Sequence, residues 1–130
     1  MSNQVANSDR LAEVFELRES FMRALEDFKP GSYPEWPLNI STKESQQVLR
    51  DTALKGIEEM FEALQHLKNW KPDRNTDMPD FDREEFLEEV VDAFNYFLSV
   101  LVLVGVSQED FFKAYVKKDA IIRKRLTSGY

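Results

Sequence analysis

The stretch FDREEFLEEVVDAFNYFLSVLVLVG, residues 81–105, combines an acidic beginning with some of the most apolar sequence in the chain. On a helical wheel at 100° per residue, its polar residues fall in one stripe about 120° wide. The stripe contains Glu85, Glu88, Glu89, Asp92, Asn95, Tyr96 and Ser99. Every other residue from 86 to 102 is apolar. Such a helix is expected to lie inside an assembly, with its polar stripe lining a cleft or facing another polar stripe.

Hydrophobic periodicity and helix-capping signals predict an all-α four-helix bundle in a single domain over residues 1–130, with no strand. The expected helices cover about residues 9–28, 41–67, 82–104 and 107–126. Ser41 with Glu44, and Asp82 with Glu85, have capping-box spacing. Gly105 is expected to end the third helix and Ser107 to cap the fourth.

Composition excludes several kinds of site. The 130 residues include no cysteine and one histidine, His66. Thiol catalysis, cysteine-ligated zinc and disulfides are therefore absent, and a multi-histidine metal site is not expected. The net charge of −7 disfavours a nucleic acid partner and favours a divalent cation.

No membrane or export segment is expected. The apolar run over residues 96–106 is well short of the ~20 residues that a membrane helix needs. Residues 1–10 are polar and lack the apolar part of a signal peptide. These features predict a cytoplasmic protein that does not interact with membranes.

Four carboxylates on the second and third helices have metal-ligand spacing. Glu59 and Glu62 are three residues apart, as are Glu89 and Asp92, so each pair projects from one helix face. Antiparallel packing would bring the pairs together, and two carboxylates at 4 Å repel by about 4 kcal/mol at an effective dielectric near 20. An all-oxygen site of this kind selects Mg²⁺, Mn²⁺ or Ca²⁺.

A plainer interpretation is open for the second helix alone. Glu58, Glu59 and Glu62 lie opposite an apolar face and are typical of a solvated helix surface. That apolar face contains Ile57, Met60, Phe61, Leu64 and Leu67. A carboxylate-bridged di-iron site is excluded, because it needs two Glu-x-x-His motifs and the lone His66 lies four residues after Glu62.

The two acidic motifs together resemble a known signature. EEMFE (58–62) and EEVVD (88–92), 25 residues apart, resemble the EExxE…EExxD pattern of the all-α nucleoside triphosphate pyrophosphohydrolases, which include MazG proteins and dimeric dUTPases. LKNWK (67–71) and YVKKDAIIRKRLTSGY (115–130) resemble further elements of the dimeric dUTPases. The resemblance covers about residues 11–130.

This resemblance implies an activity and roles for particular residues. The family hydrolyses nucleoside triphosphates to the monophosphate and pyrophosphate. Glu59, Glu62, Glu89 and Asp92 would bind Mg²⁺, for which Mn²⁺ can substitute. Glu58 and Glu88 would orient or deprotonate the attacking water, or are solvated surface acids.

Cations on the fourth helix are candidates for phosphate binding. Tyr115, Lys118 and Arg125 lie on one stripe with Phe111 and Ile122. Their alternative role is to pack their stems while their charged ends reach solvent. Family resemblance favours contacts to the β- and γ-phosphates.

The loop residues Trp70 and Lys71 are candidates to close over the nucleotide. A tryptophan of the core or of an interface is the alternative for Trp70. Asn95, one turn after Asp92, is expected to touch a phosphate or a sugar hydroxyl, or to cap the polar stripe.

The nucleobase contacts differ from the family pattern. Arg18 and Met22 stand where the dimeric dUTPases place Gln and Asn, Asp119 and Ile122 replace two Asn, and Asn95 replaces a His. The expected substrate is dUTP, followed by dCTP or a broad range of deoxynucleotides.

Assembly is expected to complete the site. The third helix is too apolar to be covered by three others, which predicts a homodimer or a dimer of dimers with a site built from both subunits.

The competing function is a non-catalytic helical module that binds a nucleotide or a protein. A calcium buffer is disfavoured because the chain has no EF-hand loop.

Overall fold

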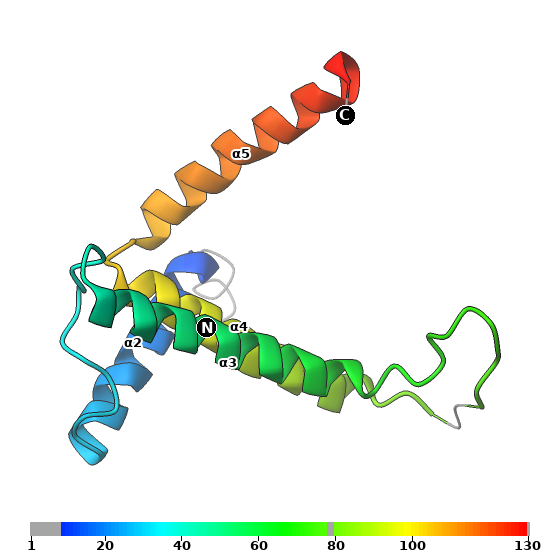
Figure 1. The fold of residues 1–130 in the computed structure, drawn as a ribbon, viewed down its shortest axis with the longest axis horizontal. Coiled ribbons are helices and arrows are strands. Elements are labelled where there is room, and N and C mark those ends of the chain that lie inside the picture. Colours follow the sequence, from blue (N-terminus) through cyan, green and yellow to red (C-terminus); the bar gives the residue numbers. More distant parts are fainter. Residues whose placement is uncertain (1–8, 78–79, 130) are drawn as a thin grey trace. The chain divides into compact units, whose positions relative to one another are not determined.

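The computed structural model describes residues 9–77 and 80–129 and contains four α-helices there (Figure 1). They are α2 (Arg10–Phe28), α3 (Lys43–Leu64), α4 (Arg83–Leu103) and α5 (Gln108–Ser128). The described ranges contain no strand. The predicted all-α class with four helices is confirmed.

Side-chain caps start the helices, because the first backbone N–H groups of a helix lack partners within it. In each case the cap oxygen accepts from the N–H three residues further on. The capping residues are Asp9, Thr42, Asp82 and Ser107. Gly105, with φ of 77°, follows the end of α4, and its N–H donates to the carbonyl of Val102 at 3.0 Å. The caps at Asp82 and Ser107 and the stop at Gly105 agree with the predictions.

The predicted start and end of the second helix were wrong by a few residues. Thr42 replaces Ser41 as the cap, because the N–H of Ser41 donates to Oδ1 of Asn39 within the preceding turn. At the other end, the N–H groups of residues 65, 66 and 67 each donate to a carbonyl three residues earlier. Such a tight turn keeps Leu64 and Leu67 at helical spacing, so apolar periodicity could not locate the end of α3 at Leu64.

The chain divides into two compact units, which are described separately. The first comprises the described residues up to Pro37 and from Leu101 onward. In it, α2 contacts α5, with the ring centroids of Phe15 and Phe111 6.1 Å apart. Met22 and Leu103 are fully buried. The single domain over residues 1–130 stays a prediction.

In the second unit, Leu38–Val100, α3 lies beside α4 (Figure 1). Gly56 contacts Phe97, while His66, after α3, lies near Glu89 in the first half of α4. Residues late in the α3 segment thus lie beside residues early in α4, so the two helices run antiparallel. The predicted convergence of their acids requires this direction. A Cβ at Gly56 would lie 2.6 Å from Cε1 of Phe97, so the absence of a side chain permits this approach.

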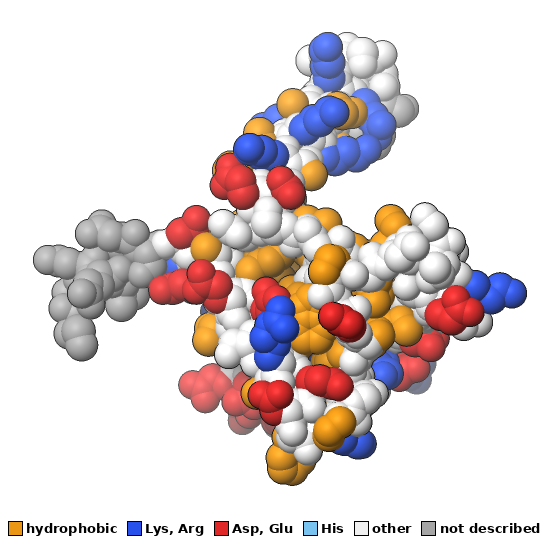
Figure 2. All heavy atoms as spheres, turned by 90° about the vertical axis from the view of Figure 1, so that its left-hand side faces the viewer, with side chains coloured by type: hydrophobic (Ala, Val, Ile, Leu, Met, Phe, Trp, Pro, Cys, Tyr) orange, Lys and Arg blue, Asp and Glu red, His pale blue; other side chains and the backbone are white. Residues whose placement is uncertain are grey.

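Several predicted core residues remain exposed in the single chain. In α3, Ile57 is 44% and Phe61 59% exposed, and in α4 Phe94 is 53% exposed. The described part of α5 has no buried residue. Figure 2 shows hydrophobic side chains among the charged ones at the surface. No single helix in the described ranges is both long and apolar enough to cross a membrane.

Candidate metal centre

Two acidic pairs meet between α3 and α4. Glu59 and Glu62 come from α3, whereas Glu89 and Asp92 come from α4. Desolvation raises the pKa of Glu59 above its ordinary value of 4.5, and the charges of Glu62, Asp92 and Glu89 raise it further. A hydrogen bond with Glu62 acts in the same direction. Glu59 is therefore close enough to the other three carboxylates to be repelled by them.

The raised pKa has a consequence for stability. Because folded Glu59 holds its proton more tightly than unfolded Glu59, its contribution to stability is complete below pH 4.5 and is lost as pH rises through the raised pKa. Above the raised pKa the ionised group opposes folding. A bound cation would relieve this repulsion, and four carboxylates form the hard oxygen donor set that suits Mg²⁺.

Two pockets adjoin three of the four acids. Glu59 and Glu89 are partly buried, whereas Glu62 and Asp92 are exposed. A pocket of about 540 Å³ is lined by Glu84, Leu87, Glu88, Val91 and Asp92. A second pocket, of about 420 Å³, is lined by Glu62, Gln65, His66, Lys68 and Glu89. A ligand can therefore approach the carboxylates from solvent.

Three further polar residues, Glu58, Glu88 and Asn95, lie on α3 and α4 beside the four acids. Glu58 and Glu88 are exposed, and Glu88 lines the same pocket as Asp92. Asn95 is partly buried and follows Asp92 by one turn of α4. These positions permit contact with a ligand at the acids, and the roles assigned to them stay predictions.

The predicted phosphate-binding residues lie on α5. Lys118 and Arg125 are exposed, and Tyr115 is 65% exposed. α5 carries six basic and three acidic residues, and Figure 2 shows its lysine and arginine side chains gathered in blue. This helix belongs to the first unit, whereas the acids belong to the second. That the cations of α5 and the acids of α3 and α4 form one site stays a prediction.

The loop after α3 exposes the predicted nucleotide-covering pair. Trp70 is 69% exposed, and Nζ of Lys71 lies 5.8 Å from the centre of its ring. An exposed indole beside a cation is free to stack on a planar ligand. It is not a core tryptophan within this chain.

The residues expected to read the base are packed in the first unit. Met22 has no exposed surface and cannot contact a base in this conformation. Arg18 is 9% exposed, and its Nη2 donates to the hydroxyl of Tyr33 at 3.4 Å. Its guanidinium also lies 5.0 Å from the ring centre of Phe21. Nucleobase recognition by Arg18 stays a prediction.

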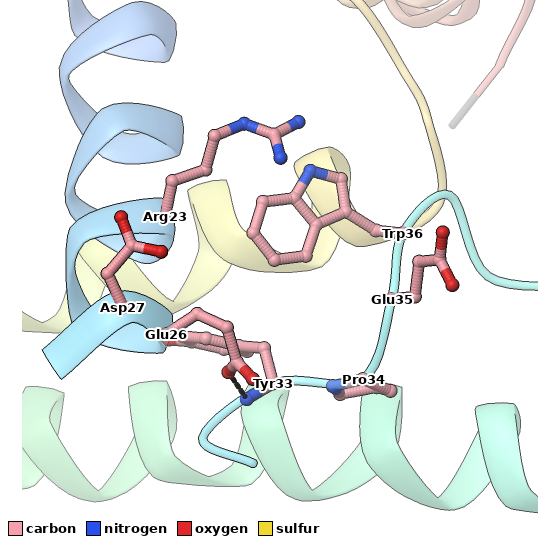
Figure 3. A pocket seen from close by; sticks show the side chains of 7 residues that line it. All are labelled: Arg23, Glu26, Asp27, Tyr33, Pro34, Glu35 and Trp36. Carbon is pink, nitrogen blue, oxygen red and sulfur yellow. Dashed lines mark hydrogen bonds between the residues drawn. The ribbon is translucent and has the colours of Figure 1, made fainter. Parts of the chain in front are cut away.

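A separate pocket of about 390 Å³ lies beside the loop after α2 (Figure 3). Its polar groups are largely paired within the protein. Glu26 accepts from the N–H groups of Gly31 and Tyr33, which lower its pKa. Arg23 stacks 4.6 Å from the ring centre of Trp36. These contacts hold the loop against α2, and this structural role was not recognised from the sequence.

The structure also brings His66 next to the acidic centre. Its Nε2 lies 2.9 Å from Oε2 of Glu89, and Glu85 is close to both. From the sequence, the single His66 argued against a multi-histidine site and a di-iron site, and no role beside the acids was predicted for it. The register that pairs position 59 with 92 also pairs 66 with 85, so an explicit antiparallel alignment of the two helices would have identified it.

Comparisons with protein-family models, with curated proteins and with solved structures found no match to this chain. Over the described residues the chain is all-α, with four helices, two of which carry the acidic centre.

Proposed function

We propose that this protein is an Mg²⁺-dependent nucleoside triphosphate pyrophosphohydrolase, acting on dUTP or another pyrimidine deoxynucleotide. One observation carries the proposal: Glu59 on α3 lies near Glu62, Glu89 and Asp92, and desolvation and the charges of these three acids raise its pKa. The resemblance of EEMFE and EEVVD to the signature of the MazG-like and dUTPase-like enzymes supports the same function. Repulsion among four acids calls for a cation, and a triphosphate is a natural companion ligand of Mg²⁺.

The proposed reaction adds water to the α-phosphorus and breaks its bond to the oxygen that bridges to the β-phosphorus. Glu59, Glu62, Glu89 and Asp92 would hold Mg²⁺, which when bound neutralises phosphate charge and acidifies coordinated water. Glu58 and Glu88 would orient the attacking water and accept its proton. Asn95 would donate a hydrogen bond to a phosphate or accept one from a sugar hydroxyl.

Residues outside the acidic centre would bind the rest of the nucleotide. Lys118 and Arg125 of α5 would neutralise the β- and γ-phosphates, with Tyr115 beside them. Trp70 would stack on the nucleotide and Lys71 would pair with its charge. The exposed position of each of these five side chains supports this assignment.

The first test is pyrophosphate release from dUTP, dCTP, dTTP, dATP, dGTP and the ribonucleotides, each measured with Mg²⁺ and with EDTA. We expect release that requires the metal, is abolished by EDTA and favours one pyrimidine. Absence of release from every nucleotide would contradict the hydrolase and favour the alternative, a non-catalytic helical module. Nucleotide binding without turnover would identify that module directly.

Assembly into a homodimer or a dimer of dimers is part of the proposal. It is supported by the apolar residues exposed on α5, among them Phe112, Val116 and Leu126, which are 51–74% exposed. Apolar faces of this kind are usually covered by a partner. The basic charge of α5 suits the acidic remainder of the chain, so a second copy is the expected partner.

Light scattering at micromolar concentration should therefore detect a single oligomeric species. Leu126→Glu, which places a charge on the exposed face of α5, is expected to shift the protein toward a monomer. Thr127→Glu adds the same charge at an exposed polar position next to Leu126 without removing an apolar side chain, and serves as the control. A wild-type mass of about 15.2 kDa would contradict the assembly.

A further inference from the structure

A mixed nitrogen and oxygen cluster lies at one end of the acidic centre. One ligand atom each from His66, Glu85 and Glu89 can be chosen so that all lie within 4.8 Å of one another. Metal–ligand bonds to imidazole and carboxylate are about 2.0–2.2 Å long, so these donors need only a small movement of the side chains to bind one ion. The cluster lies wholly within the unit Leu38–Val100.

Local structure supports each of the three side chains. His66 lies in the tight turn after α3, where its N–H donates to the carbonyl of Ala63 at 3.1 Å. Glu85 and Glu89 are four residues apart in the first turns of α4 and therefore share one helix face. Phe86 packs edge-on against the imidazole, with ring centroids 6.4 Å apart, and limits the orientations of His66.

One oxygen of this cluster lacks a hydrogen bond. Oε2 of Glu89 is shielded from solvent, and among the buried side-chain oxygens and nitrogens of residues 9–77 and 80–129 it alone has no hydrogen-bond partner. It nevertheless lies 2.9 Å from Nε2 of His66, within ion-pair distance. A cation bound by both atoms would satisfy this oxygen more fully than the imidazole contact alone.

We infer that His66, Glu85 and Glu89 form a second cation site, which binds a divalent first-row transition-metal ion of the Co²⁺ and Zn²⁺ class. Imidazole nitrogen favours such ions over Mg²⁺, whereas an all-carboxylate site does not. The pocket beside His66, about 420 Å³ in volume, leaves room for water or an exogenous ligand on the ion. This site needs no nucleotide and goes beyond the proposed hydrolase.

The two centres share Glu89 but differ in their other ligands. Glu59, Glu62 and Asp92 belong only to the all-oxygen centre, while His66 and Glu85 belong only to the mixed one. A substitution at a ligand that belongs to only one centre therefore leaves every ligand of the other centre in place. This separation makes failure of the transition-metal site distinguishable from failure of the proposed function.

The experiment uses the untagged full-length chain, because a polyhistidine tag would bind the same ions. With no cysteine and one histidine in the sequence, imidazole coordination has a single source. CoCl₂ is titrated in equilibrium dialysis, and ZnCl₂ is titrated while the imidazole carbon resonances of His66 are followed by NMR. We expect one ion of either metal per chain at this site, and a shift of the His66 resonances with Zn²⁺ that is larger than any shift with equimolar MgCl₂.

Three variants complete the test. His66→Gln should lower Co²⁺ affinity at least tenfold, whereas Gln65→Ala, a neutral change in the same pocket, should leave it unchanged. Glu59→Gln should retain Co²⁺ binding and the His66 shift even if it loses Mg²⁺-dependent hydrolysis. Unchanged Co²⁺ affinity in His66→Gln, or a His66 resonance that does not respond to Zn²⁺, would overturn the site. If the wild type and all variants bind Co²⁺ as expected but none hydrolyses a nucleotide, only the proposed hydrolase function is contradicted.

Discussion

Glu59→Gln is expected to lower kcat for nucleotide hydrolysis at least about 100-fold while leaving the metal-free fold as stable as before or more stable. The substitution removes one carboxylate from the Mg²⁺ ligands and one charge from the repulsive group. Glu59 is the right position because desolvation and three neighbouring acids raise its pKa. Activity and stability should thus change in opposite directions.

The pH dependence tests the same electrostatics. Protonated Glu59 resembles glutamine, so the difference in unfolding free energy between wild type and variant should be small below pH 4.5 and grow as pH rises through the raised pKa. The measurement is urea denaturation in EDTA at several pH values. Mg²⁺ should then stabilise wild type more than the variant, since it binds the folded wild-type protein better.

Asp51→Asn is the matched control for Glu59→Gln. Asp51 is an exposed acid on α3, two turns before Glu59, and its substitution makes the same change in charge. It should alter neither turnover nor the response to Mg²⁺. Full turnover in Glu59→Gln would show that Glu59 is not a metal ligand, and a large loss of metal-free stability would show that the carboxylate has a structural role instead.

Gly56→Val is expected to destabilise the protein by about 2 kcal/mol or more, the largest effect on folding that we predict. Any Cβ at this position would lie 2.6 Å from Cε1 of Phe97, closer than side chains pack. Gly56→Ala adds the same Cβ but gains about 1 kcal/mol of helix propensity, so its net cost should be smaller. Urea denaturation of both variants should give a graded loss.

Lys55→Ala and Phe97→Leu provide the controls for the Gly56 substitutions. Lys55 is exposed on the same turn, and its substitution should leave stability nearly unchanged. Phe97→Leu removes Cε1 and Cζ, two of the three ring atoms that a Cβ at position 56 would meet, so the double variant should be destabilised by less than the sum of the single variants. Wild-type stability in Gly56→Val would mean that α3 and α4 do not approach closely here.

This packing contact also bears on the metal centre. Gly56 lies one turn before Glu59, so separating α3 from α4 at Gly56 would move Glu59 and Glu62 away from Glu89 and Asp92. Gly56→Val should therefore weaken Mg²⁺ stabilisation as well as the fold. We therefore expect the close approach of the helices and the convergence of the acids to depend on the same small residue.

Much of the local structure could be predicted because its causes are local. The caps at Asp82 and Ser107 and the stop at Gly105 depend on side chains and backbone conformations within a few residues, which the sequence displays directly. The end of α3 was misplaced because a tight turn preserves the apolar spacing of a helix. The spacing of Glu59 with Glu62 and of Glu89 with Asp92 placed each pair on one face in advance.

The sequence by itself determined four helices and the two acidic pairs, because helix periodicity and capping act over one or two turns. Only the tertiary structure decided which residues meet across α3 and α4: the contact of Gly56 with Phe97 and the approach of His66 to Glu89. It also decided that Met22 is buried while the described part of α5 has no buried residue. The physical reason is that burial and register depend on contacts between segments distant in the chain, which a helical wheel treats one helix at a time.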